Sequence, residues 1–506
     1  MTESIDAVLS QIREGLKPLS GPVYAPVISV AELLDEDLDQ VVYLAAIGAS
    51  FIACLILGQI SSVPARKAFS SAAGLTISFF FYGLLCFLDL GYILVNYMLM
   101  RCLPRSLAGA AMTCFSAVAL ASASFYHFQI NQATGGWDID LIFMMNFIKV
   151  HMMAVNYVNA AKLDDPVAGK DLTQRERYFA EPLRERVPFM DFVHYFLFCG
   201  AAWTGMSHEY RNFDDFINCK GDYANIPKNG LFVPALKRFA QCLACLGAFV
   251  ILASNVSYKQ LLTEEYAQAS FAYKAAMLVA AVHLKVVSCY IGFTAMEANF
   301  IACGQGYRPA STVKDKDGKV VEHVPEDFCA IKQIHIWVFE TQETWTGAVA
   351  GWNVQVHNWL KYYVMLRWMD RSKPRGQLQV MPTVVTFLAS AAWHGIEIGF
   401  FICFTGMALN DYTFKVGEKT QIAAWVDKNI PYRVYHPFMF LYQWFVGAYC
   451  VAAFVLLRFE DFMFVHRSLH YSGHFLLIAN AIIVTILPKV SRKKTPPAKI
   501  DPDTAS

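Results

Sequence analysis

Hydrophobic residues in this chain are gathered into long runs, and this pattern constrains the fold more than any other feature of the sequence. A helix that crosses a bilayer needs about 20 mostly apolar residues. Runs of this kind lie at residues 41–60, 68–87, 88–103, 106–127, 139–158, 190–207, 235–255, 271–296, 378–408, 435–457 and 468–488. The sequence therefore predicts an all-α polytopic membrane protein with about eleven transmembrane helices.

The overall composition favours the same fold class. Of the 506 residues, 56% are hydrophobic and only 16% are charged, whereas an average soluble protein carries about 25% charged residues. A soluble surface of this size would be short of polar cover. The net charge of +1 gives no indication of nucleic-acid binding.

The chain shows no internal repeat and no separate soluble domain, so one membrane domain is expected over residues 41–488. Residues 1–40 are predicted to form an N-terminal lumenal segment with a short amphipathic helix at Ile5–Leu16. Residues 489–506 are predicted to form a basic cytosolic tail. Two polar stretches, residues 161–189 and 307–330, are expected to be loops because they combine both charge signs with prolines or turn residues.

Charges beside the first and last spans predict the orientation of the chain. An acidic cluster at residues 35–39 precedes the first span, Arg66 and Lys67 follow it, and basic residues at 489–494 follow the last. Because basic flanks favour the cytosolic side, we expect a lumenal N-terminus and a cytosolic C-terminus, which requires an odd number of spans. Protease added to intact microsomes should remove a C-terminal tag and spare an N-terminal one. A protected C-terminal tag would contradict this topology.

One histidine lies inside a long apolar run of the chain. Val380–Leu409 contains Trp393-His394-Gly395 and only one charged residue. Ionisable residues within a span are costly and usually face a cavity or pathway. The glycines at 395 and 399 would let another helix or a substrate chain approach the backbone. The alternative is a buried structural histidine whose nitrogens are satisfied by neighbouring helices.

Asn353 is the second polar residue of interest. It belongs to the segment Trp352-Asn353, which is followed by Trp359-Leu360-Lys361. A side-chain amide can orient a substrate or stabilise negative charge on a carbonyl oxygen. The alternative is an ordinary helix-start residue at the membrane edge, which is a common place for asparagine.

Together, these residues resemble a known family. Trp352-Asn353 with Trp359-Leu360, followed by the Trp-His-Gly-x-x-x-Gly pattern, is similar to the membrane-bound O-acyltransferase family and especially to its lysophospholipid acyltransferase branch. Further matches are Gly136-Trp137-Asp138, Glu297-Ala298-Asn299, Gly304-Gln305-Gly306-Tyr307 and the run Val484–Lys489 into the basic tail. The ordered set covers roughly residues 40–490.

The resemblance implies a fold, a place and an activity. The helices would surround a central reaction chamber in the endoplasmic reticulum membrane. His394 would act as general base on the free hydroxyl of a lysophospholipid, and Asn353 would orient the substrate or stabilise the oxyanion. Acyl-CoA would be the donor and co-substrate in a phospholipid-remodelling reaction. No metal and no bound organic cofactor are implied.

Further residues are predicted to bind substrate. They are Trp352, Trp393, Gly395, Arg371, Lys373 and Arg375. The last three lie in the stretch 353–376, where aromatic and basic residues alternate as in an interfacial amphipathic helix with a basic loop. Their cations would meet the phosphates of CoA on the cytosolic side. The alternative is that this stretch serves only as a positive-inside signal.

The sequence also allows other functions. Within the family, the alternative acceptors to a lysophospholipid are a sterol, a diacylglycerol and a protein. The Trp-Asn-x5-Trp-Leu-Lys segment favours the phospholipid branch. Outside this family, the alternative is a transporter with a buried histidine. Inverted repeats and paired charges within spans, which are typical of transporters, are not evident in the sequence. His466, His470 and His474 share a helix face at metal-ligand spacing. A structural role is favoured for them because no carboxylate or cysteine completes the set.

Overall fold

The computed structural model describes residues 25, 27–33, 38–127, 140–159, 183, 185–204, 206–314, 320–342, 344–369 and 379–490. Almost every element in this part of the chain is a helix. By its internal contacts, the chain divides into two units, one formed by Met1–Ala240 with Ala295–Lys332 and the other by Gln241–Thr294 with Gln333–Ser506. Two helices, α11 (Phe232–Ala253) and α13 (Phe271–Cys303), contribute residues to both units.

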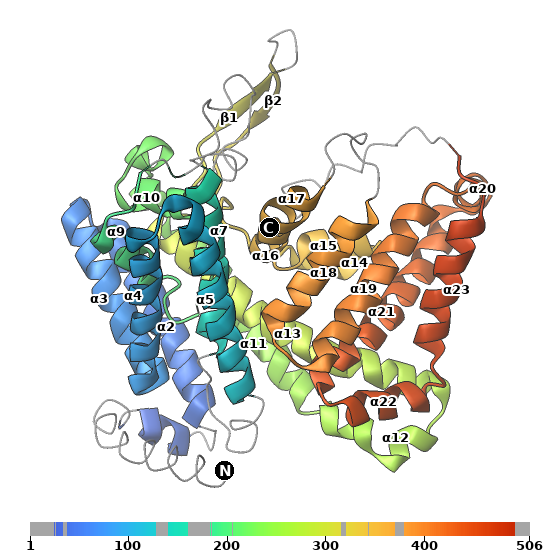
Figure 1. Cartoon of the computed structure of the whole chain (residues 1–506). Helices are drawn as coiled ribbons and strands as arrows, with labels where there is room; N and C mark the ends of the chain where they lie inside the picture. Colours follow the sequence, from blue (N-terminus) through green and yellow to red (C-terminus); the bar gives the residue numbers. More distant parts are fainter. Residues whose placement is uncertain are drawn as a thin grey trace. The chain divides into compact units, whose positions relative to one another are not determined.

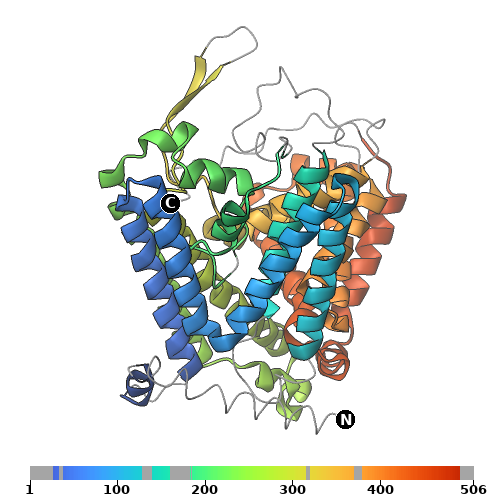
Figure 2. The same ribbon diagram turned by 60° about the vertical axis from the view of Figure 1, so that its left-hand side comes forward.

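The first unit contains the N-terminal helices. They are α2 (Leu38–Gln59), α3 (Val63–Tyr82), α4 (Cys86–Cys102), α5 (Arg105–Tyr126), α7 (Asp140–Asn159), α9 (Phe189–Phe196) and α10 (Tyr210–Ile217), with the 3-10 turns η1 (Gly83–Leu85), η3 (Gly221–Asn225) and η4 (Lys228–Gly230). Helices that follow one another in the chain pack together, α2 against α3, α4 against α5 and α5 against α7 (Figure 2). An antiparallel hairpin, β1 (Ser311–Lys314) and β2 (Val320–Val324), follows α13.

The second unit contains most of the C-terminal half. Its elements besides α11 and α13 are η5 (Tyr258–Leu262), α12 (Glu264–Gln268), α14 (Ile336–Thr341), α15 (Trp345–Gly351), α16 (Val354–Trp359), the π-helical segment η6 (Leu360–Met365), α17 (Leu366–Trp368), α18 (Val380–His394), α19 (Ile398–Gly417), α20 (Gln421–Asn429), α21 (Tyr432–Leu456), α22 (Phe459–Ser468) and α23 (Ser472–Ile486). α19 packs against α18, α21 and α23 (Figure 1).

Within the described residues, seven helical segments are long and apolar enough to cross a membrane, or eight if the bent pair α22 and α23 forms one span. The seven are Gln40–Gln59, Val63–Cys102, Arg105–Tyr126, Asp140–Asn159, Lys228–Leu262, Phe271–Cys303 and Tyr432–Leu456. The prediction of an all-α, polytopic membrane protein is therefore confirmed. The predicted count of eleven spans is not.

The difference has local causes. The predicted spans 68–87 and 88–103 are α3 and α4, which η1 joins into one helical stretch from Val63 to Cys102. The predicted span 190–207 is helical only as far as Phe196, and the predicted span 378–408 is interrupted at Gly395. An apolar run shows that a segment avoids water, but it does not show whether the backbone within it is continuous.

The irregular chain after Phe196 is held by side chains of other helices. The hydroxyl of Ser50 on α2 donates to the carbonyl of Cys199 at 2.7 Å, and the hydroxyl of Tyr82 on α3 donates to the carbonyl of Trp203 at 2.7 Å. Cys199 and Trp203 are fully buried. Because an apolar environment offers no water to an open backbone, a non-helical segment is tolerated there only where the protein supplies partners.

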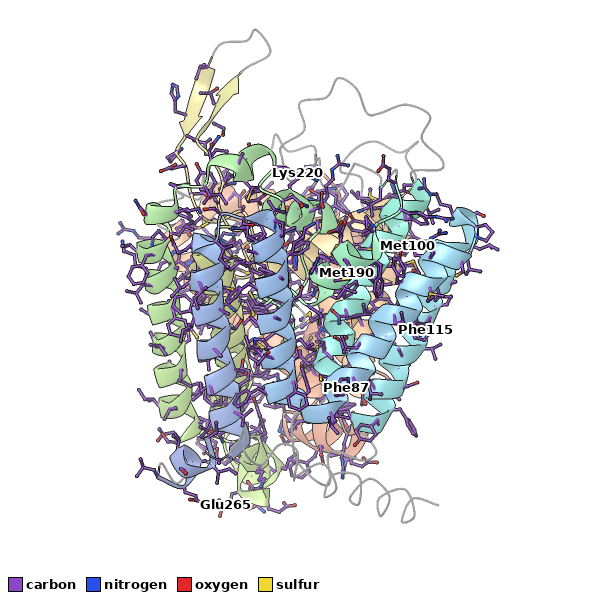
Figure 3. The ribbon with its side chains drawn as sticks, turned by 90° about the vertical axis from the view of Figure 1, so that its left-hand side faces the viewer. Phe87, Met100, Phe115, Met190, Lys220 and Glu265 are labelled. Atoms are coloured by element: carbon purple, nitrogen blue, oxygen red, sulfur yellow. The ribbon has the colours of Figure 1, made fainter. Side chains whose placement is uncertain are left out.

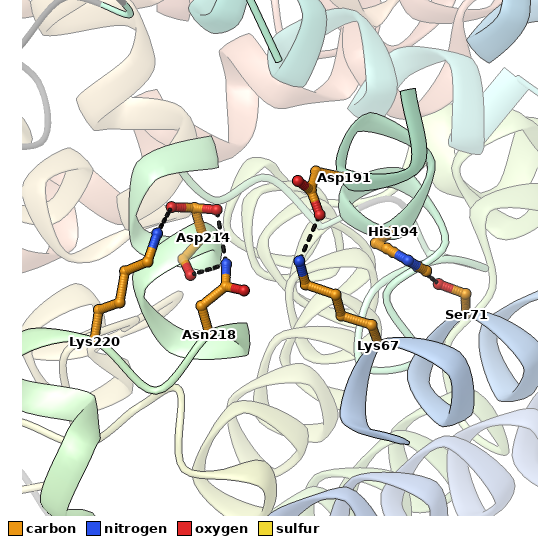
Figure 4. Close-up of polar contacts among 7 residues, drawn as sticks. All are labelled: Lys67, Ser71, Asp191, His194, Asp214, Asn218 and Lys220. Carbon is orange, nitrogen blue, oxygen red and sulfur yellow. Dashed lines mark hydrogen bonds and ion pairs between the residues drawn. The ribbon is translucent and has the colours of Figure 1, made fainter. Parts of the chain in front are cut away.

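Two polar contacts fix α9 to α3 (Figure 4). Lys67 Nζ lies 2.6 Å from Asp191 Oδ1, and Ser71 Oγ lies 2.6 Å from His194 Nδ1. The two α3 residues are four apart and the two α9 residues three apart, so each pair shares one helix face. The contacts hold the short α9 in place at the point where the irregular segment begins.

The outer faces of the helices are apolar, as expected for contact with lipid. Phe87 on α4 is 55% exposed, whereas Met100 on the same helix is 1% exposed (Figure 3). α4 therefore presents one face outward and buries another against its neighbours.

Several sequence predictions lie outside the described residues. They are the helix at Ile5–Leu16, most of the loop at 161–189, residues 315–319 of the loop at 307–330, the motif Gly136-Trp137-Asp138, and the basic tail beyond residue 490. The predicted domain boundaries 1–40, 41–488 and 489–506 stay predictions.

Candidate active site

The apolar run around His394 is broken next to the histidine. α18 ends at His394, Gly395 adopts φ 148°, and α19 begins at Ile398. This φ lies in a region that favours glycine, because an L side chain would clash with the backbone. The break places His394 at the last residue of a helix instead of in the middle of a span.

Gly399 has a different role. A Cβ atom added at Gly399 would come within 2.2 Å of the carbonyl oxygen of Ala453 on α21. The start of α19 therefore approaches α21 more closely than any side chain would permit. For this glycine, the predicted close approach of another helix is present.

The ring of His394 lies among aromatic rings. Its centroid is 5.2 Å from that of Phe404, nearly parallel to it, and 4.9 Å from that of Phe454, nearly perpendicular to it. The side chain is partly exposed and makes no hydrogen bond to any residue that the structure describes. A structural histidine is normally hydrogen-bonded, so this arrangement favours the functional interpretation.

Asn353 has an unusual backbone and an unpartnered side chain. Its φ of 39° and ψ of 59° are left-handed, a conformation that asparagine adopts more readily than most residues. It stands at the N-cap of α16, but its side chain makes no capping hydrogen bond. Its Oδ1 is buried and, within the described part of the chain, has no partner. Asn353 thus lies at a helix start, as the alternative interpretation expected, but its side chain does not cap that helix.

The backbone on both sides of Asn353 is held by one segment. The Val354 N–H donates to the Gln333 carbonyl at 2.7 Å, and the His335 N–H donates to the Gly351 carbonyl at 2.9 Å. Residues 333–335 thus run beside residues 351–354. This pairing fixes the chain before and after the left-handed residue.

The two predicted motifs are carried by neighbouring elements of the second unit. The rings of Trp359 and Trp393, both 2% exposed, have centroids 5.9 Å apart. η6, which follows Trp359, packs against α18. π-helical turns are rare and are found frequently at functional sites. The fold therefore joins the asparagine motif to the histidine motif through the tryptophan of each.

The other predicted site residues are placed as follows. Trp352 packs against Phe339, with ring centroids 4.8 Å apart. Arg371, Lys373 and Arg375 lie outside the described residues.

The histidines on the last helices have structural partners. His466 Nε2 lies 3.1 Å from the carbonyl oxygen of Tyr449, and His474 Nδ1 lies 2.6 Å from the hydroxyl of the same tyrosine. His470 is exposed. Among the residues that the structure describes, no group of three side chains could hold a metal ion. The structural interpretation of these histidines fits their contacts.

Comparisons with known proteins agree on one family. The family model described as "membrane-bound O-acyltransferase family" matches residues 111–452. "Lysophospholipid acyltransferase 5" of Homo sapiens is 23% identical over 441 residues, which cover 85% of this chain and 83% of that protein. "Lysophospholipid acyltransferase" of Saccharomyces cerevisiae is 25% identical over 331 residues, which cover 61% of this chain and 51% of that protein. "Lysophospholipid acyltransferase 1" of Arabidopsis thaliana is 21% identical over 364 residues, which cover 71% and 75%. The family match spans both motifs, and we conclude that the chain is an acyltransferase of the membrane-bound O-acyltransferase family.

Proposed function

We propose that the protein transfers an acyl group from acyl-CoA to the free hydroxyl of a lysophospholipid. Similarity to three lysophospholipid acyltransferases supports this acceptor. The observation that carries the proposal is the state of His394. It is a partly exposed imidazole at a helix end, with no hydrogen bond to a described residue, in the unit that also carries Asn353.

The reaction follows from these two side chains. The imidazole of His394 takes the proton of the acceptor hydroxyl, because an imidazole that is neutral at physiological pH has a free ring nitrogen that can accept a proton. The oxygen attacks the thioester carbonyl carbon, and the carbon–sulfur bond then breaks. The CoA thiolate leaves with the proton from the imidazolium, and the new ester remains on the phospholipid.

The amide of Asn353 suits two tasks in this reaction. Its oxygen, which is buried and has no partner among the described residues, can accept a hydrogen bond from an N–H or O–H group of a bound substrate other than the reacting hydroxyl, and so orient that substrate. Its NH2 group can donate to the oxyanion that forms on the thioester carbonyl. Donors fixed before the reaction stabilise such charge without reorganisation.

The proposal includes a location. The enzyme resides in the endoplasmic reticulum membrane with a lumenal N-terminus and a cytosolic C-terminus. Acyl-CoA then enters from the cytosolic side, where the polar CoA moiety stays in water while the acyl chain enters the membrane.

The direct test is acyl transfer by membranes that contain the protein. Membranes are incubated with labelled acyl-CoA and, separately, with lysophospholipids of several headgroups, a diacylglycerol, a sterol or a peptide. Label is expected in phospholipid, and membranes without the protein give the background. If label appears only in a sterol, diacylglycerol or peptide, the proposed acceptor is wrong, but the assignment to the acyltransferase family still holds.

Neutralising Arg371, Lys373 and Arg375 together is expected to raise the KM for acyl-CoA. The three cations would otherwise pair with the CoA phosphates by charge-assisted hydrogen bonds. The KM for the lysophospholipid should change much less, because its binding does not depend on these charges. Initial rates at varied concentrations of each substrate measure both constants.

The matched control neutralises Arg492, Lys493 and Lys494, three tail cations that belong to the predicted topology signal and not to the predicted CoA site. It should leave the KM for acyl-CoA unchanged. If the loop variant also leaves that constant unchanged but disturbs the protease pattern of terminal tags, the basic loop is a topology signal and not a CoA site.

A further inference from the structure

A polar network joins α13 to α14 close to the residues that precede Asn353. The hydroxyl of Tyr290 donates to Glu340 Oε1 at 2.5 Å, and His283 Nε2 lies 3.3 Å from the same oxygen. His283 and Tyr290 are seven residues apart on α13, which is two helical turns, so both lie on one face. One carboxylate of α14 therefore contacts two side chains of α13.

α14 depends on such contacts for its position. It has only six residues, Ile336–Thr341, and so short a helix has little stability of its own. Its neighbour is the backbone that leads to Asn353. A Cβ atom added at Gly351 would lie 3.1 Å from Val338 Cγ1 and 3.3 Å from the backbone nitrogen of Phe339. The chain thus passes directly against α14 two residues before the asparagine.

Trp352, which precedes Asn353, is enclosed by rings of the same two helices. Its centroid is 4.8 Å from Phe339 on α14 and 5.3 Å and 6.1 Å from Phe293 and Tyr290 on α13. Tyr290 therefore does two things. Its ring packs against Trp352, and its hydroxyl fixes the helix that supports the other side of that tryptophan.

The backbone of Asn353 needs this support. A non-glycine residue in the left-handed region persists where its surroundings over-determine it. Here the segment 333–335 and the enclosed Trp352 define the chain on both sides of the residue. A small movement of α14 would shift the amide, and a misplacement of about 1 Å can cost about 10²-fold in rate.

We propose that Tyr290, Glu340 and His283 form a positioning network that holds the Asn353 amide in its reactive orientation through α14 and Trp352. The inference rests on the proposed role of Asn353. None of the three side chains needs to touch substrate. Their contacts are not evident from the sequence, because Tyr290 and Glu340 lie 50 residues apart.

The test begins with Tyr290→Phe, which removes the hydroxyl and keeps the ring against Trp352. We expect kcat to fall about tenfold, with both KM values within about twofold of the parent, because geometry and not substrate binding is affected. The control is Tyr442→Phe. It also deletes a partly buried tyrosine hydroxyl bond, from Asn480 Nδ2 at 2.7 Å, and should retain the parent kcat.

Two substitutions of Glu340 distinguish a positioning role from a direct role in the chemistry. Glu340→Gln keeps an oxygen that can accept from Tyr290 and should retain kcat within about threefold of the parent, whereas Glu340→Ala should lose at least as much as Tyr290→Phe. If Glu340→Gln is as impaired as Glu340→Ala, the carboxylate charge itself is required and the positioning role is wrong. If Tyr290→Phe fails to accumulate in membranes, the comparison of Glu340→Gln with Glu340→Ala tests the positioning network instead.

A double-mutant cycle links the network to Asn353. Tyr290→Phe should cost about tenfold in the parent and almost nothing in an Asn353→Ala background, since the amide it positions is gone. Equal losses in both backgrounds, or a parent-like Tyr290→Phe beside an impaired Asn353→Ala, would overturn the network alone. A parent-like Asn353→Ala would instead overturn the proposed role of Asn353.

Discussion

His394→Gln is expected to lower acyl transfer by about 10²- to 10⁴-fold while the protein still accumulates in membranes, because general-base catalysis contributes on this scale. Glutamine keeps the polarity and approximate size of the side chain but cannot accept a proton near neutral pH. The ring of His394 makes no hydrogen bond to a described residue. The substitution therefore breaks no hydrogen bond in the described part of the fold, and the loss reports on chemistry.

The measurement is the rate per amount of purified enzyme, together with monodispersity in detergent and retained binding of acyl-CoA. His470→Gln is the matched control, since His470 is exposed on the same chain and should tolerate the change. A His394→Gln variant that turns over at the parent rate would remove the catalytic assignment. Failure to accumulate would point to the structural role that the sequence left open.

The helical class of the fold could be predicted because hydropathy and helix length are linked in a membrane. Runs such as 41–60, 106–127 and 139–158 have the length of a span, and they coincide with α2, α5 and α7. Each of these helices satisfies its own backbone, so its existence depends on no distant partner. For these three helices, the local hydropathy pattern was sufficient to predict the helix.

The irregular segments could not be predicted in the same way. The chain from Cys199 to Trp203 is as apolar as a span, but its backbone is satisfied by Ser50 and Tyr82, more than a hundred residues earlier. The local sequence gives no indication of these hydrogen-bond partners. At Gly395 a local signal exists, since a glycine follows the histidine, but glycines inside apolar helices are common and a break did not follow from it.

The site residues that belong to a local motif could be predicted from the sequence. Those that are brought together only by tertiary contacts could not. His394 and Asn353 each stand beside a tryptophan in a recognisable order. The Tyr290–Glu340 contact joins elements that are remote in sequence. Two signals could have suggested it: His283 and Tyr290 share a face of α13, and Glu340 directly follows the apolar stretch 336–339.

Asn353→Ala is expected to lower the rate of acyl transfer at least tenfold, and by about 10²- to 10³-fold if the amide donates to the oxyanion. Alanine also changes the backbone, because a left-handed φ is costlier for it than for asparagine, by about 1 kcal/mol. A loss in this variant alone would therefore mix two causes. Rates at matched protein level, with both KM values, are the measurement.

Asn353→Gly separates the two causes. Glycine adopts the φ of 39° observed at this position without strain, so the backbone is preserved while the amide is removed. If the amide acts on substrate, Asn353→Gly should be impaired as severely as Asn353→Ala, with the fall mainly in kcat because the interaction is made in the transition state. If Asn353→Gly approaches the parent rate while Asn353→Ala does not, asparagine is needed here only for its left-handed backbone. The oxyanion would then need another donor, and His394 would stand as the one reacting side chain assigned in this unit.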